Sequence, residues 1–133
     1  MAKNKIIANK PPVVDVGTLE FSESNYRRGD EHWMAATLYK AVMDQGLEPF
    51  DLPLAALDLS VLHFSVKSAD EFIWQMKRCL DCDYNIPIIL DDLGQIADGS
   101  HRVCKAILEG KSTILAYRLQ HMPAPDFLGK DKS

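Results

Sequence analysis

The chain has 133 residues, and its 15 Lys and Arg against 19 Asp and Glu give it a formal net charge of -4. A chain of this length with 47% hydrophobic residues is typical of one domain with a buried core, so neither disorder nor a disulfide framework is needed to explain it. The acidic balance argues against tight DNA binding, because nonspecific affinity for nucleic acid depends on clustered cations.

The apolar residues are not arranged for a membrane. No stretch approaches the roughly 20 apolar residues of a membrane span, and residues 1–7 hold only a two-residue apolar run, which is too short for a signal peptide. The three cysteines, an odd number, favour free thiols in a reducing compartment. We therefore expect a cytoplasmic protein that makes no membrane contact.

The first half of the chain predicts little regular structure apart from one helix. Residues 1–12 lack periodicity and are expected to form a flexible N-terminus, and the valines that follow predict a short extended segment. A helix is then expected over residues 31–45, because Asp30 is a favourable N-cap, the segment contains no Gly or Pro, and Gly46 ends it. Residues 13–50 are thus predicted to be an N-terminal extension with one helix.

Residues 51–122 are expected to form the core of the domain. The short apolar segment 52–59 carries Pro53 and suits an edge strand. A capping box from Ser68 to Glu71 predicts a helix over residues 69–82, with Trp74 roughly opposite its apolar stripe. That stripe consists of Phe72, Ile73, Met76, Cys79 and Leu80.

The remaining elements follow at short intervals. Residues 88–90 form an apolar run before an Asp-Asp-Leu-Gly turn, which predicts a hairpin with a return strand at 96–97. A helix over residues 101–109 and a strand over residues 113–119 complete the core. Residues 123–133 show little periodicity and are expected to be a flexible C-terminus.

The residues best placed for chemistry are those from Asp98 to Arg102, at the junction between the return strand and the next helix. Gly99 permits a tight turn, and Ser100 is expected to cap the helix. His101 and Arg102 then lie beside the free N–H groups of the first helical turn, an arrangement that favours a phosphate. The sequence leaves open a second interpretation, in which Arg102 pairs with Asp98 or Asp92 and His101 is an ordinary surface residue.

This region resembles the ParB/sulfiredoxin superfamily. The run Ile-Pro-Ile-Ile-Leu-Asp-Asp-Leu-Gly-Gln-Ile-Ala-Asp-Gly-Ser-His-Arg over residues 86–102 is followed in register by Ala106, Gly110, Lys111, Ile114 and Ala116. The similarity is dense over residues 86–119 and extends in element order to residue 52. It implies a single-domain α/β fold with a small mixed sheet, packed helices and, in this chain, an N-terminal helical extension.

The resemblance also implies a function. Superfamily members bind nucleotides such as ATP at this turn, so Gly99, Ser100, His101 and Arg102 are expected to bind the phosphates of ATP or another nucleotide. Ser100 stands where sulfiredoxins have their catalytic cysteine, so we do not expect this chain to be a sulfiredoxin. The Asp-Gly-x-His-Arg form is most similar to the free-serine kinase branch and to small phage- and plasmid-type members, which implies a Mg²⁺-dependent ATPase or small-molecule kinase.

Asp98 has three possible tasks beside a phosphate. It can accept amide N–H groups of the turn, pair with Arg102, or hold a Mg²⁺ ion that bridges to the phosphates. In an enzyme, Asp98 would be a catalytic residue that holds the metal or acts as a base. Asp91 and Asp92 could join a metal site, but an Asp-Asp-x-Gly hairpin tip is more often turn chemistry.

The alternative to an enzyme is a noncatalytic interaction module. In that interpretation residues 31–45 and Trp74 form a surface for a homodimer or another protein, since the apolar residues of the predicted helix cover over half of its circumference. A nuclease or DNA-binding protein is less consistent with the negative charge. The Cys79–Cys82 pair lies late in a predicted helix and has no second pair, so we expect no structural zinc there.

Overall fold

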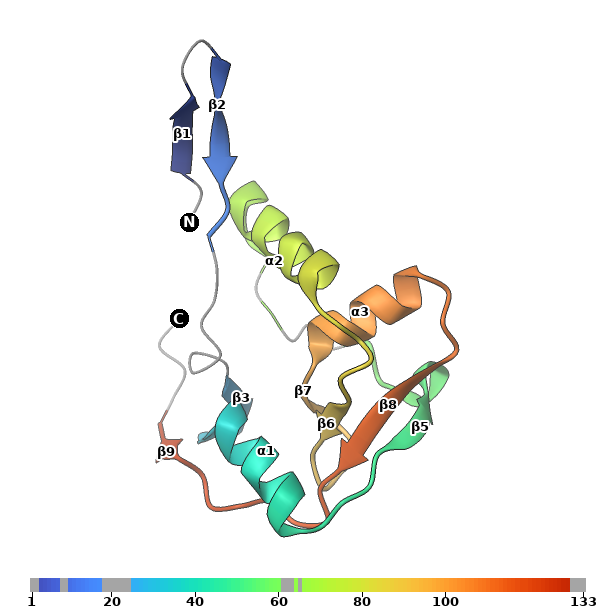
Figure 1. The fold of residues 1–133 in the computed structure, drawn as a ribbon. Helices are drawn as coiled ribbons and strands as arrows, with labels where there is room; N and C mark the ends of the chain where they lie inside the picture. Colours follow the sequence, from blue (N-terminus) through green and yellow to red (C-terminus); the bar gives the residue numbers. More distant parts are fainter. Residues whose placement is uncertain (1–2, 8–9, 18–24, 61–63, 65, 130–133) are drawn as a thin grey trace.

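A computed structural model describes residues 3–7, 10–17, 25–60, 64 and 66–129 (Figure 1). Within this part of the chain, four strands precede the first α-helix, the later strands and helices are interspersed, and one short 3-10 helix follows the fifth strand. The elements are β1 (Lys3–Ile7), β2 (Lys10–Asp15), β3 (Asn25–Arg28), β4 (Glu31–Met34), α1 (Ala35–Asp44), β5 (Phe50–Pro53), the 3-10 helix (Leu54–Ala56), α2 (Ala69–Asp81), β6 (Ile88–Leu90), β7 (Ile96–Asp98), α3 (Ser100–Leu108), β8 (Thr113–Arg118) and β9 (Phe127–Leu128).

A four-stranded sheet in the order β5-β8-β6-β7 forms the centre of the domain. Strand β8 runs parallel to β6, and the other neighbours are antiparallel. The predicted hairpin of β6 and β7 is confirmed, and β5 is an edge strand as expected. It ends at Pro53, earlier than predicted, because the chain then turns into the 3-10 helix, where the Leu54 amide bonds the Ser112 carbonyl at 2.9 Å.

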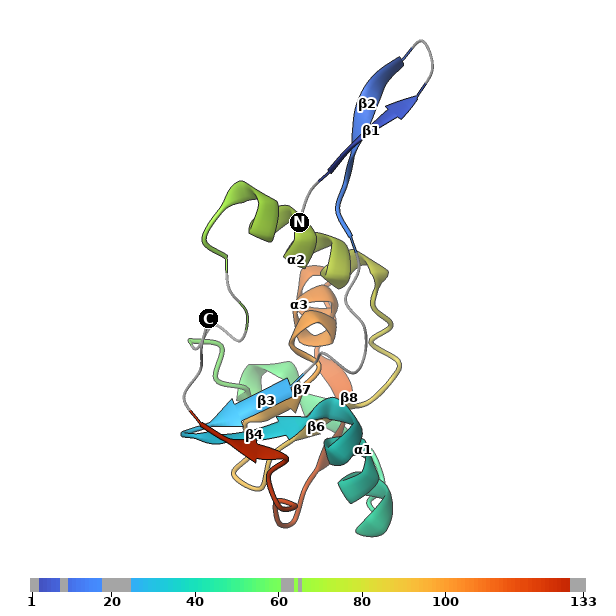
Figure 2. The same ribbon diagram turned by 90° about the vertical axis from the view of Figure 1, so that its left-hand side faces the viewer.

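Strand β6 is apolar on both faces because the sheet separates two hydrophobic clusters. Ile88 and Leu90 belong to the cluster under α3, whereas Ile89 belongs to the cluster that contains side chains of β4 and α1. Alternation of side chains along the strand sends neighbours to opposite faces. The N-terminal segment from β3 to α1 is therefore part of the same mixed α/β domain, and it covers the sheet face opposite α3 (Figure 2).

The predicted helix over residues 31–45 is wrong at its start. Residues 31–34 form β4, which pairs with β3 and with the distant β9, and Trp33 is buried there with its Nε1 donating to the Pro123 carbonyl at 2.8 Å. Helix α1 begins only at Ala35. Asp30 therefore does not cap it, and Asp126 instead accepts the Met34 amide at 2.7 Å.

The apolar residues of this segment serve the protein's own core. Within the cluster on the β4 and α1 side, the buried side chains from the segment are Trp33, Leu38, Ala41 and Val42. The expectation that residues 31–45 offer an apolar surface to a partner is therefore not supported, although Met43 is exposed. Residues 31–45 contain many apolar side chains because β4 and α1 both pack against the central sheet.

Helix α2 begins where the sequence predicts, since the Ser68 hydroxyl accepts the Glu71 amide at 3.1 Å. Its buried face matches the predicted apolar stripe only in part, at Cys79. Phe72, Ile73 and Leu80 are all about half exposed or more, whereas Gln75 and Cys79 are buried. Helices α2 and α3 pack together on one side of the sheet (Figures 1 and 2), and Gln75 lies on the α2 face toward α3.

The two ends of the described chain contain strands where flexible termini are expected. Strands β1 and β2 form an antiparallel hairpin that extends away from the rest of the molecule (Figures 1 and 2). Near the other end, β9 adds a third strand to the β3-β4 pair. In the described ranges, no helix is long and apolar enough to cross a bilayer.

Candidate functional site

The turn between β7 and α3 is shaped by Gly99. Its φ of +113° lies in the left-handed region, and a Cβ built on it would stand 2.5 Å from Cγ2 of Ile88. Only glycine fits this position without strain. Gly99 is also the N-cap of α3, so Ser100 is the first helical residue and the expectation that Ser100 caps the helix is wrong.

Arg102 is held in place by four oxygens. Its Nη2 bonds Oδ2 of Asp98 at 2.6 Å, and the two side chains are only 12% and 17% exposed. Its Nη1 donates to the carbonyls of Pro87 at 2.9 Å and Ile86 at 3.1 Å, and to the Tyr39 hydroxyl at 3.2 Å. The sequence-based alternative that Arg102 pairs with Asp98 is thus confirmed, and the guanidinium connects α1, the segment before β6, β7 and α3.

His101 is a half-buried residue with a polar contact and not an ordinary surface residue. Its Nε2 lies 2.6 Å from Oε1 of Gln75, and its ring packs against Phe64 at 4.7 Å between centroids. Because Oε1 can only accept, Nε2 carries the proton and Nδ1 is left as an acceptor. Burial, with the nearby cations of Arg78 and Arg102, lowers the pKa of His101 to about 4, so the ring is neutral at pH 7.

This lowered pKa predicts acid sensitivity. Between pH 4 and the unfolded value of about 6.5, the unfolded chain binds a proton at His101 that the folded protein does not. The free energy of unfolding should therefore fall by about 2 kcal/mol from this group alone as the pH goes from 7 to 5. Urea unfolding of wild type and His101→Gln at pH 7 and pH 5 measures this pH dependence, which should be smaller in the variant. Equal pH dependence in the two proteins would contradict the prediction.

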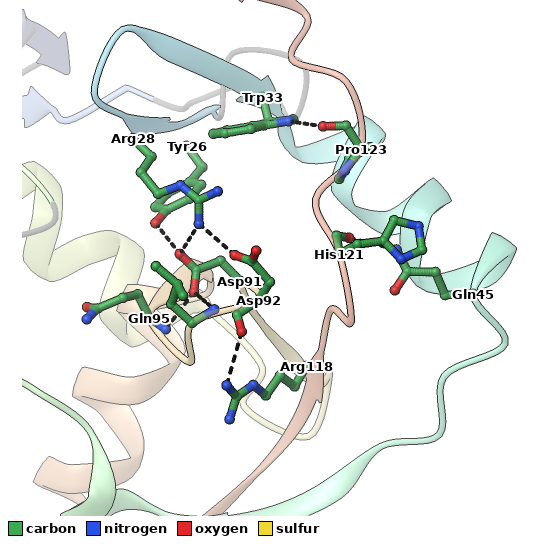
Figure 3. Close-up of polar contacts among 11 residues, drawn as sticks. Tyr26, Arg28, Trp33, Gln45, Asp91, Asp92, Gln95, Arg118, His121 and Pro123 are labelled. Carbon is green, nitrogen blue, oxygen red and sulfur yellow. Dashed lines mark hydrogen bonds and ion pairs between the residues drawn. The ribbon is translucent and has the colours of Figure 1, made fainter.

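Asp91 anchors a second cluster at the turn of the β6–β7 hairpin (Figure 3). It is fully buried, and its Oδ1 accepts the amides of Leu93 at 2.9 Å and Gln95 at 2.8 Å. Its Oδ2 accepts the Tyr26 hydroxyl at 2.8 Å and Nη1 of Arg28 at 3.3 Å. The expected turn chemistry is present, and the same carboxylate also joins β3 to the hairpin.

Asp92 and the aromatic groups complete this second cluster. Arg28 Nη1 bonds Asp92 at 2.6 Å, and its guanidinium lies over the Trp33 ring at 5.6 Å (Figure 3). Asp92 is therefore engaged by Arg28 and not by Arg102. Burial and the hydrogen bond to Asp91 raise the pKa of Tyr26, which keeps the hydroxyl protonated as the donor. The arrangement is that of a structural anchor.

The described residues contain no group of three or more His, Cys, Asp or Glu that could hold a metal ion. Mg²⁺ is often bound by one or two carboxylates together with substrate phosphates, so the magnesium role of Asp98 stays a prediction. Cys79 is buried in the α2–α3 interface region, and burial raises its pKa to about 11, which suits an inert core thiol. Cys82 Sγ donates to the Cys79 carbonyl at 3.1 Å.

No protein-family model, curated protein or solved structure matches this chain. The resemblance of residues 86–119 to the ParB/sulfiredoxin superfamily therefore stays a prediction that depends on the motif itself. The structure does place Asp98, Gly99, Ser100, His101 and Arg102 in one compact turn at the start of α3. It adds residues that the sequence analysis did not select, namely Tyr39, Phe64, Gln75 and Arg78.

Proposed function

We propose that the chain binds a nucleotide through its phosphates at the turn from Asp98 to Arg102. The observation that carries this proposal is the position of the Arg102 guanidinium, which three neutral oxygens fix beside the first turn of α3. Neutral acceptors orient the cation without cancelling its charge. Its charged partner in the described structure is Asp98, which can turn to another ligand while Arg102 stays in place.

The first turn of α3 supplies the remaining donors of the proposed site. The amides of Ser100, His101 and Arg102 have no acceptor within the helix, because they precede its first internal hydrogen bond from Val103 to Gly99. Together with the helix dipole, they favour an anion. Since the His101 ring is neutral and bonded to Gln75, its proposed contact with phosphate is through the backbone N–H.

The proposed chemistry follows from Asp98 and from the motif. When ATP or another nucleotide is bound, Asp98 is proposed to hold a Mg²⁺ ion or to act as a base, which gives a Mg²⁺-dependent ATPase or small-molecule kinase with a ParB/sulfiredoxin-like fold. Mg²⁺ would offset the negative charge of the phosphates beside the carboxylate. Ser100 in place of a cysteine leaves no thiol here for sulfiredoxin chemistry. The proposal includes a cytoplasmic location.

A noncatalytic interaction module is the second candidate. The observation that favours it is the exposed apolar face of α2, where Phe72, Ile73 and Leu80 are 52%, 48% and 74% exposed. Trp74, which was expected to mark a partner surface, lies against the Arg78 guanidinium at 5.2 Å from its ring centre. This candidate predicts a protein complex that does not need Arg102.

A thermal-shift screen with ATP, ADP, CTP and GTP, each with and without Mg²⁺, tests the nucleotide proposal. Ligand at about 100 times its Kd should stabilise the fold by roughly 2.7 kcal/mol, and a larger shift with Mg²⁺ supports the metal role of Asp98. Calorimetry should then show that Arg102→Lys weakens binding about tenfold or more, because lysine lacks the fork that contacts several oxygens. The matched control is Arg28→Lys, an arginine of the Asp91 cluster. Flat melts for all four nucleotides at millimolar concentration would contradict the proposal.

A further inference from the structure

Arg78 differs from the other arginines of the described chain. Arg27, Arg28, Arg102 and Arg118 each donate a side-chain hydrogen bond to a carbonyl or a carboxylate. In residues 25–60, 64 and 66–129, the Arg78 guanidinium has neither kind of acceptor, although Arg78 is partly buried and desolvation lowers its pKa. Partial burial of a cation without a hydrogen-bond acceptor is unfavourable. The Asp98 carboxylate attracts Arg78 but is already bonded to Arg102, so the donors of the Arg78 fork are left for a further anion.

The position of Arg78 on α2 places it beside the proposed phosphate site. Gln75 and Arg78 are one helical turn apart and lie on the same face, and Gln75 makes the 2.6 Å contact with His101. The charge of Arg78 also acts on both His101 and Asp98, which flank Gly99 and Ser100. Arg78 and Arg102 are therefore two cations on neighbouring helices whose charges act on the same turn.

Trp74 holds the Arg78 guanidinium without neutralising it. The guanidinium carbon lies 5.2 Å from the centre of the Trp74 ring, a distance typical of a cation–π contact. Such a contact orients the planar fork but leaves its N–H donors available. This differs from Arg102, whose Nη2 is already bonded to Asp98. The structure thus prepares Arg78 to receive a negatively charged group.

We infer that Arg78 binds a second phosphate of the nucleotide and so makes the site select nucleoside di- and triphosphates over monophosphates. The inference rests on the proposed function. One phosphate lies on the first turn of α3 beside Arg102, and the next one along the chain reaches the Arg78 fork from α2. A monophosphate satisfies only the first position, and Arg78 then contributes little to its binding.

Calorimetric titration of AMP, ADP and ATP into wild type and Arg78→Ala tests this inference. We expect Arg78→Ala to weaken ATP and ADP binding by about tenfold or more, the effect of losing a charge-assisted hydrogen bond, and to change AMP binding by less than about threefold. The control is Lys77→Ala, because Lys77 is the neighbouring cation on α2 and pairs with Asp81 at 2.7 Å. It should leave all three affinities unchanged.

Two further measurements keep the outcomes distinct. The melting temperature of Arg78→Ala without ligand should change little, since the loss of the contact with Trp74 and of the attraction of Asp98 is offset by the removal of a partly buried cation. Inorganic pyrophosphate, used as a probe without a nucleoside, should bind wild type and lose affinity in Arg78→Ala. Equal loss for AMP and ATP, or no loss for either, overturns the role of Arg78 while nucleotide binding stands. Failure of wild type to bind any nucleotide or pyrophosphate overturns both.

Discussion

Replacement of Asp91 by alanine should lower the free energy of unfolding by about 3–5 kcal/mol, because it breaks a buried, fully bonded ionic contact. The carboxylate is 0% exposed and accepts four hydrogen bonds, two from amides of its own turn and one each from Tyr26 and Arg28. Its removal leaves a partly buried hydroxyl and two amides without partners, and each unsatisfied group costs about 1–3 kcal/mol. Urea unfolding of wild type and Asp91→Ala, monitored by circular dichroism, measures the loss of unfolding free energy.

Asp92→Ala is the matched control, since both aspartates bond the same nitrogen of Arg28. The Asp92 side chain is 30% exposed, so water replaces its lost contact and the loss of stability should be much smaller. Trp33 fluorescence gives a local readout, because Arg28 lies over its ring. Similar effects of the two substitutions would show that Asp91 is not the anchor of β3 on the β6–β7 hairpin.

The error in predicting residues 31–45 shows what a local pattern omits. Asp30 and the absence of Gly and Pro favour a helix from residue 31, yet β4 occupies residues 31–34. Strand pairing decides the outcome, because Glu31 and His32 pair with Leu128 and Phe127 near the other end of the described chain. A sequence pattern within one window contains no information about a partner strand almost a hundred residues away.

Helix α2 shows a different limit. Its N-terminal cap and its length follow from the sequence, and the structure confirms both. The apolar stripe indicates which face is hydrophobic but not which face is covered. The covered face includes Gln75, which makes a polar contact with His101 of α3. Phe72 and Ile73 stay exposed.

The candidate site was predictable as far as its residues are adjacent in the chain. The motif from Asp98 to Arg102 and the pairing of these two residues, four positions apart across the start of α3, are both accessible to sequence reasoning. Tyr39 and Gln75 were not accessible, because they lie 63 and 26 positions from the residues that they contact. Only the packing of α1 and α2 around the turn brings them into the site.

Gly99→Ala should destabilise the protein by about 2–5 kcal/mol. Placing a side chain at a φ of +113° costs roughly 1–2 kcal/mol, because Cβ crowds the backbone in the left-handed region. The new methyl group would also lie 2.5 Å from Cγ2 and 2.8 Å from Cβ of Ile88, and overpacking of a core costs about 1–3 kcal/mol. Ile88 is fully buried in the central strand β6 and has no room to move away.

Gly110→Ala separates the two contributions to this loss. Gly110 has a φ of +78° with nothing within 4 Å of an added Cβ, so it should lose only the backbone part, roughly 1–2 kcal/mol. A double-mutant cycle of Gly99→Ala with Ile88→Ala, followed by urea unfolding, then tests the clash itself. If the methyl group collides with Ile88, the double variant is less destabilised than the sum of the single variants. Additive losses, or a Gly99→Ala loss equal to that of Gly110→Ala, would show that the turn has room for a side chain.

The added Cβ of Gly99→Ala would also stand 3.1 Å from Nη2 of Arg102. This second close contact should displace the guanidinium from Asp98, so Gly99→Ala should weaken nucleotide binding as well as stability.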